Sequence, residues 1–205
     1  MNAFEYTLLG AGVLAPLLFA GTVLTGAGIR PGYTHRANAV SELIESGAPH
    51  KAGLDIAFLA YNTVLIAFCV GLVLYFDDAP AGIRLGTWFL FGTGVLGLVT
   101  WQFPMDPIGR RATFRGIGHL VLAGLMSLGT MAAIASFAVG AGSLDGWTWF
   151  AVYSWITFAF VLTTGGFAAV SAIGRWPTMG LLERLTIGGG LQWVLVLAVA
   201  VLVAA

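Results

Sequence analysis

The chain has 205 residues, of which 59% are hydrophobic and only 9% are charged. Soluble domains carry about 25% charged residues, so this composition excludes an ordinary soluble domain and predicts an integral membrane protein. Nine basic and nine acidic residues balance to zero net charge, and no basic run occurs, so nucleic acid is not expected as a partner.

Six stretches are long enough to cross a bilayer, because a transmembrane helix needs about 20 apolar residues. They are residues 6–29, 54–76, 83–103, 114–140, 148–174 and 181–204. The first carries Glu5 where a secretory signal would be basic, so we expect it to be a retained helix. All connections except 30–53 are short, which makes successive helices antiparallel neighbours. The sequence predicts an all-α fold: one domain over residues 1–205, built as a single bundle of six transmembrane helices.

Basic residues are unevenly distributed over the connections. The connections after the first, third and fifth stretches, with the start of the sixth, carry Arg30, Arg36, Lys51, Arg110, Arg111, Arg115, Arg175 and Arg184, whereas the other side carries only Arg84. The positive-inside rule then places both termini outside the cell membrane and the odd-numbered connections in the cytoplasm. Arginines kept for a binding site would produce the same asymmetry. In either orientation the polar residues of 30–53, 104–119 and 175–184 meet at one membrane face.

The connection 30–53 contains the segment RANAVSELIESG. Asn38 is placed to cap a short helix ending at Gly47, with Ser41 and Glu42 turned away from its apolar side, Val40, Leu43 and Ile44. Two interpretations stay open: an amphipathic helix lying at the membrane interface, or a lid over a pocket between the helices.

The segment FPMDPIGRRATFRGIGHL, residues 103–120, interrupts the apolar sequence. Pro104 and Pro107 bracket Asp106, which is either a turn residue or a catalytic acid. His119 is expected about 7–8 Å inside the next helix, where an ionisable side chain usually has a partner. Asp106 or Glu183 could be that partner, and a single backbone carbonyl or hydroxyl could satisfy the ring as well.

The last connection leads into the segment GLLERL. Glu183 falls in the first turn of the sixth helix, where an acid favours the helix dipole, and Arg184 points to a different side. Deeper in the bundle, Asn62 and Gln192 are expected to hydrogen-bond between helices. The single cysteine, Cys69, excludes a disulfide framework within the chain.

Several motifs together resemble a known family. They are SEL in the first connection, FPMD after the third stretch, GH in the fourth helix, and GLLER followed by Trp193 in the sixth. In combination and order they are similar to the six-helix membrane family named domain of unknown function 998. The resemblance covers essentially the whole chain. It implies a six-span fold and places Ser41, Glu42, Asp106, His119, Glu183 and Arg184 at the family's polar motifs, but it implies no reaction.

No cofactor is expected. His119 is the only histidine in a predicted span, which disfavours a bis-histidine haem site. The only lysine, Lys51, lies in a connection, which excludes a retinal Schiff base within a span. No phosphate-binding loop or dinucleotide fingerprint occurs.

Three functions are compatible with these residues. The favoured one binds or moves a lipid or other amphiphile, with its head group at Ser41, Glu42, Asp106, Arg110, Arg111, Arg115, His119, Glu183 and Arg184; arginine suits a phosphate or zwitterionic group. The second is an intramembrane hydrolase or acid/base enzyme using Ser41, Asp106, His119 and Glu183, or a zinc version with His35 and His50. The third is an accessory subunit that docks a membrane partner protein, and a homo-oligomer is also left open. We expect Asp106, His119 and Glu183 to lie close together with at least one of Arg110, Arg111 and Arg115, and with Ser41 and Glu42 above them.

Overall fold

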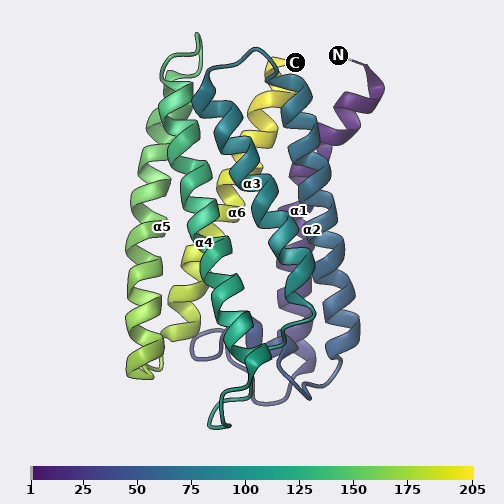
Figure 1. Ribbon diagram of the computed structural model, residues 1–205, viewed down its shortest axis with the longest axis vertical. Helices are drawn as coiled ribbons and strands as arrows, with labels where there is room; N and C mark the ends of the chain where they lie inside the picture. The colour runs from purple at the N-terminus through teal and green to yellow at the C-terminus, as the bar shows by residue number, and fades with distance from the viewer. Residues whose placement is uncertain (1) are drawn as a thin grey trace.

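The computed structural model describes residues 2–205. Within this range the chain forms six long helices, one short 3-10 helix and no strands (Figure 1). The elements are α1 (Ala3–Ile29), η1 (Val40–Ile44), α2 (Lys51–Tyr75), α3 (Ala81–Thr100), α4 (Phe114–Ala141), α5 (Thr148–Gly174) and α6 (Met179–Ala204). All six long helices are long and apolar enough to cross a membrane. The prediction of an all-α bundle of six such helices is confirmed, and the chain has the features of a multi-pass membrane protein.

Local hydrogen bonds set the helix ends more closely than hydropathy does. α1 begins with a capping box, in which Asn2 Oδ1 accepts the Glu5 N–H at 3.0 Å and the Glu5 carboxylate accepts the Asn2 N–H at 3.1 Å. α2 starts at Lys51 instead of 54, and α3 ends at Thr100 instead of 103. The length of an apolar stretch predicts only the part of a helix that lies in the hydrocarbon core of a bilayer, so the helix ends are predicted only to within about one turn.

The six long helices form a closed ring. Each packs against the helix before and after it in sequence, and α6 returns to pack against α1. The connections 30–50, 101–113 and 175–178 therefore lie at one end of the bundle, here called the odd-loop end, and both described termini lie at the other, the even-loop end (Figure 1). This arrangement agrees with the expected gathering of the three polar connections at one face.

The half of the ring nearest the even-loop end is filled by a core of aromatic side chains. Phe68, Phe137, Phe150 and Trp193 are fully buried there. The Trp193 ring lies 5.3 Å from that of Phe137 and 5.8 Å from that of Phe150, between centroids, and its indole N–H donates to Ser154 Oγ at 2.9 Å. This core closes the bundle at the even-loop end.

Exposed tryptophans mark both ends of α5. Trp149 lies in its first turn and Trp176 just beyond its last residue, with 52% and 45% of each side chain exposed. A helical rise of 1.5 Å per residue separates the two by about 40 Å, which matches the roughly 40–45 Å thickness of a bilayer including its headgroup regions. Tryptophan is enriched at such interfaces, so α5 has the length and end groups of a spanning helix.

Candidate functional site

A cavity of about 680 Å³ occupies the half of the bundle nearest the odd-loop end. All six long helices and η1 contribute to its wall. The deep part is apolar, lined by Leu65, Leu90, Val161 and Val194, and these residues also belong to the core that closes the even-loop end. The volume lies within the roughly 300–1,000 Å³ of sites that hold small molecules.

The cavity opens sideways between α4 and α5. These helices meet at the connection 142–147 and diverge toward the odd-loop end (Figure 1). Gly124 and Leu128 of α4, and Leu162 and Gly166 of α5, line the cavity and are also exposed. An apolar chain in the bilayer therefore has a route into the cavity that avoids the polar end.

Three ionisable side chains line the cavity near the odd-loop end, one from each even-numbered helix. Asp55 of α2, His119 of α4 and Glu183 of α6 each lie four or five residues after the first residue of their helix. A rise of 1.5 Å per residue puts all three at a similar depth, about 6–8 Å inside the helix start. Since α2, α4 and α6 alternate around the ring, the three side chains reach the cavity from three sides.

His119 is 5% exposed and its ring is fixed by one hydrogen bond. Nδ1 lies 2.9 Å from the Phe103 carbonyl oxygen. A carbonyl can only accept, so Nδ1 carries the proton, and Nε2 of the neutral ring remains an acceptor. Phe103 offers this oxygen because α3 has already ended at Thr100. Of the partners that the sequence left open, the ring has a backbone carbonyl, and within residues 2–205 it makes no hydrogen bond to Asp106 or Glu183.

Asp55 is a site residue that the sequence reasoning missed. Its Oδ2 pairs with Lys51 Nζ at 2.5 Å, whereas Oδ1 is buried and has no hydrogen-bond partner within residues 2–205. An unpartnered carboxylate oxygen is costly to bury, so it marks a place where a donor would be stabilised. Asp55, His119 and Glu183 share one feature in the sequence, because each lies four or five positions after the start of an even-numbered helix. For Asp55 this feature is recognisable only if α2 is known to begin at Lys51.

Glu183 joins α6 to η1. Its Oε2 accepts the Val40 N–H at 2.7 Å, and Val40, Ser41 and Ile44 of η1 line the cavity beside it. Ser41 Oγ donates to Met105 Sδ at 3.0 Å, which ties the same segment to the α3–α4 connection. The first connection thus lines the odd-loop end of the cavity, and its interpretation as a lid stays a prediction.

The other acids of the predicted site hold backbone instead of lining the cavity. Asp106 accepts from the N–H and hydroxyl of Thr113 at 2.7 and 2.8 Å, and Thr113 Oγ accepts the Gly116 N–H at the start of α4. Glu42 accepts from the Ala39 N–H and the Asn38 side chain, both at 2.7 Å. The short helix is therefore capped by Glu42, not by Asn38 as expected, and it is a 3-10 helix.

The arginines also lie away from the cavity. Arg110, Arg111 and Arg115 are exposed and are not among its lining residues. Arg184 donates to Asn38 O at 2.7 Å, to His35 O and His35 Nδ1 at 3.0 Å each, and to the Tyr33 hydroxyl. Its guanidinium also lies 5.5 Å from the centre of the Tyr33 ring. Asp106 and these arginines therefore do not line the cavity with His119 and Glu183, and the expected convergence of the four groups stays a prediction.

Burial of Tyr33 against Arg184 changes its acidity. Burial raises the pKa of the Tyr33 phenol to about 12, in opposition to the nearby Arg184 charge. The phenol is neutral at physiological pH, and Arg184 remains its cationic donor. Arg184 therefore acts as a clamp between α6 and the first connection.

Two arrangements considered for an enzyme, a serine paired with a histidine and a metal site, are not formed within residues 2–205. Ser41 donates to Met105, and no hydrogen bond joins it to His119. A nucleophile and its base are expected within hydrogen-bond reach. In the same part of the chain, no three histidine, cysteine, aspartate or glutamate side chains lie close enough to share a metal ion, and His35 is bound to Arg184.

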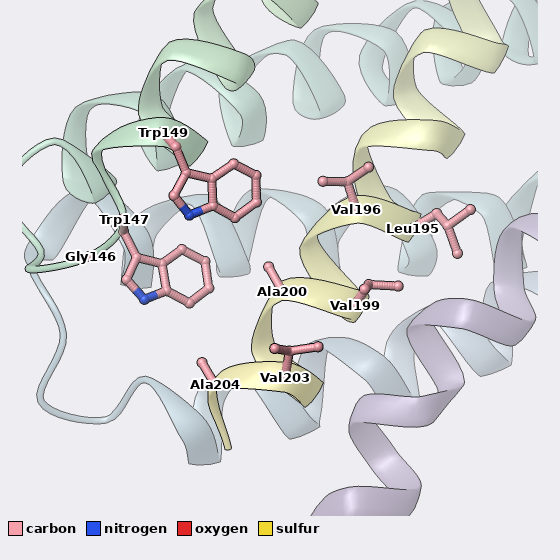
Figure 2. A pocket seen from close by; sticks show the side chains of 9 residues that line it. All are labelled: Gly146, Trp147, Trp149, Leu195, Val196, Val199, Ala200, Val203 and Ala204. Carbon is pink, nitrogen blue, oxygen red and sulfur yellow. The ribbon is translucent and has the colours of Figure 1, made fainter.

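A second hollow, of about 530 Å³, lies on the outer surface at the even-loop end. Figure 2 shows the Trp147 and Trp149 rings projecting toward Val196 and Ala200 of α6. The wall is apolar, and it contains no titratable side chain. Such a surface is typical of lipid-facing helices at an interface, and we assign no site to it.

Comparison with known proteins gives one match. The family model described as "Protein of unknown function (DUF998)" matches residues 13–200, nearly the whole chain. No curated protein and no solved structure matches the chain.

Proposed function

The chain belongs to this DUF998 family of unknown function, and we propose that it binds a membrane amphiphile in the cavity of its odd-loop half. One observation carries the proposal: a cavity with a polar end and an apolar depth opens sideways between two membrane-spanning helices. This shape matches an amphiphile that keeps its head group near the membrane face and its chain between helices.

The closed aromatic core supports binding over passage through the protein. Trp193 and Phe137 are fully buried between the cavity and the even-loop end. A pore would need a continuous route past them, whereas a binding site needs only the opening between α4 and α5. We therefore favour a protein that takes up and holds its ligand from the bilayer.

Two glycines provide a direct test. Gly124 and Gly166 line the cavity, and a Cβ added at either meets no atom within 4 Å. A side chain can therefore begin at either position without displacing backbone, and we expect a tryptophan there to obstruct the opening between α4 and α5. Gly188 of α6 is the matched control, because it is exposed, has no neighbour within 4 Å of its Cβ position and does not line the cavity.

The experiment is native mass spectrometry of protein extracted from membranes in polymer nanodiscs or mild detergent. We expect a defined amphiphile to accompany the wild type and the Gly188→Trp variant, and to be lost from Gly124→Trp and Gly166→Trp. Equal adducts in all four proteins would show that the amphiphile lies outside the cavity. Absence of any adduct from the wild type, together with no uptake of added single-chain amphiphiles, would refute the proposed function.

A further inference from the structure

The polar end of the cavity has unused hydrogen-bond acceptors. Within residues 2–205, His119 Nε2 makes no hydrogen bond, whereas Nδ1 donates to the Phe103 carbonyl. In the same part of the chain, Asp55 Oδ1 is buried without a partner, and Oε2 is the engaged oxygen of Glu183. Two of the donors in the lining are engaged, since the Ser41 hydroxyl donates to Met105 and the Asn62 amide donates to Phe58 O at 2.8 Å. A ligand that completes this set must donate.

The charged residues of the cavity lining also favour a ligand that donates hydrogen bonds and carries a positive charge. Asp55 and Glu183 are its carboxylates, and no lysine or arginine of residues 2–205 lines the cavity. Lys51 offsets Asp55 from outside the lining, and the Arg184 guanidinium is directed to the first connection. A carboxylate in a mostly apolar cavity is costly without a compensating positive charge. A phosphate or carboxylate head group would add a second negative charge and find no donor of opposite charge there.

Aromatic rings complete the surroundings of this polar end. Phe19, Phe58 and Tyr61 line the cavity and form an edge-to-face cluster, with Phe19 ring centroids 5.4 Å from Phe58 and 5.1 Å from Tyr61. Trp101 lines the cavity as well. Rings of this kind attract ammonium groups through their negative faces.

We infer that the cavity takes a single-chain amphiphile with a primary ammonium head group, which lies at the polar end where Asp55, His119 and Glu183 offer acceptors from three sides. The inference rests on the proposed function, because it names the ligand class of the same cavity. It also reverses the head group expected from the sequence, since the arginines that favoured a phosphate lie elsewhere. The apolar depth near Leu65 and Val194 receives the chain.

The test compares three probes that share one chain: tetradecylamine, tetradecanol and tetradecyl phosphate. Each is added to the whole protein in nanodiscs of phosphatidylcholine, and specific binding is counted by native mass spectrometry, with Gly166→Trp as the background. We expect the amine to bind about tenfold more tightly than the alcohol or better, and the phosphate not to bind above background. Glu183→Gln and Asp55→Asn should each weaken the amine by about tenfold and leave the alcohol unchanged.

The wild-type comparison does not depend on any variant's folding, and a melting curve checks each variant. Equal binding of the three probes, or preference for the phosphate, would overturn the ammonium inference while leaving the amphiphile site intact if Gly166→Trp abolishes the binding. Binding of no probe to the wild type would overturn both proposals. Amine binding that survives in Gly166→Trp would place the amine outside the cavity and would also count against the inference.

Discussion

Replacing Arg184 by alanine should release the first connection from the bundle. The guanidinium donates to Asn38 O at 2.7 Å and to the Tyr33 hydroxyl, and it reaches His35 twice at 3.0 Å. Its remaining bond, to Gly180 O at 2.8 Å, lies within α6 and holds no connection. The variant thus removes most of the polar contacts between α6 and residues 33–38.

The magnitude follows from which of these bonds are protected from water. Hydrogen bonds made by charged groups contribute about 1.5–3 kcal/mol each. The two bonds to His35 are exposed, so we count mainly those to Asn38 and Tyr33. Ordering the arginine side chain costs about 2 kcal/mol, which leaves a net loss of about 1–4 kcal/mol. Local opening of residues 33–45 should then rise by about 5- to 700-fold.

Hydrogen exchange followed by mass spectrometry, in nanodiscs, measures this opening directly. Arg111→Ala is the control, because Arg111 is exposed in another connection of the same end. Exchange should accelerate in residues 33–45 of Arg184→Ala and stay at the wild-type rate in Arg111→Ala. If both variants exchange at the wild-type rate, the apolar cluster of Val23, Val40, Leu43 and Leu54 holds the connection alone and the clamp is refuted.

Three further predictions concern stability and pH. Gly82→Ala should lower the free energy of unfolding by about 1–3 kcal/mol, because its Cβ would lie 2.7 Å from backbone atoms of α4. Gly92→Ala has no atom within 4 Å of its Cβ, so it should leave this free energy unchanged or raise it by up to about 1 kcal/mol. Thermal unfolding in detergent measures both, and a shift of the same sign in the two variants would contradict the prediction. Between pH 10 and about 12, the raised pKa of Tyr33 means that the folded state keeps a proton that the unfolded state loses. The free energy of unfolding of the wild type should therefore fall across this window, and that of Tyr33→Phe should depend less on pH. Parallel pH profiles of the two proteins would refute this. Asp106→Ala should destabilise the start of α4 by about 1–2 kcal/mol and leave amphiphile binding unchanged. Loss of binding in a variant that remains folded would show that Asp106 belongs to the binding site.

Hydropathy predicted the helices because a helix that spans a bilayer must be apolar over most of its length. It did not predict where the polar side chains are used. Asp106 stands in a proline turn and looks available, yet its partner Thr113 lies seven residues later and completes a cap. Arg184 appears free in the sequence, but its partners Asn38 and Tyr33 come from a connection far away in the chain. Such hydrogen bonds between distant residues depend on the packing of α6 against α1 and the first connection, which the sequence does not reveal.

His119 and Glu183 could be predicted as cavity residues, because ionisable side chains inside spans usually face protein or a cavity. Asp55 could not be recognised while α2 was expected to begin at 54, since an acid at a helix start has an ordinary role there. The start at Lys51 moves Asp55 into the second turn and toward the cavity. The nature of the polar end also required the structure, because unused acceptors are visible only once the donors' partners are known.

The central claim is that the odd-loop half of the bundle encloses a ligand. An electron cryomicroscopy structure in native lipid, read for density inside the cavity, tests it most directly. The account predicts an elongated density that runs from the Asp55, His119 and Glu183 end toward Val194 and continues to the opening between α4 and α5. A cavity filled by its own side chains, or holding only separate water-sized peaks, would contradict it.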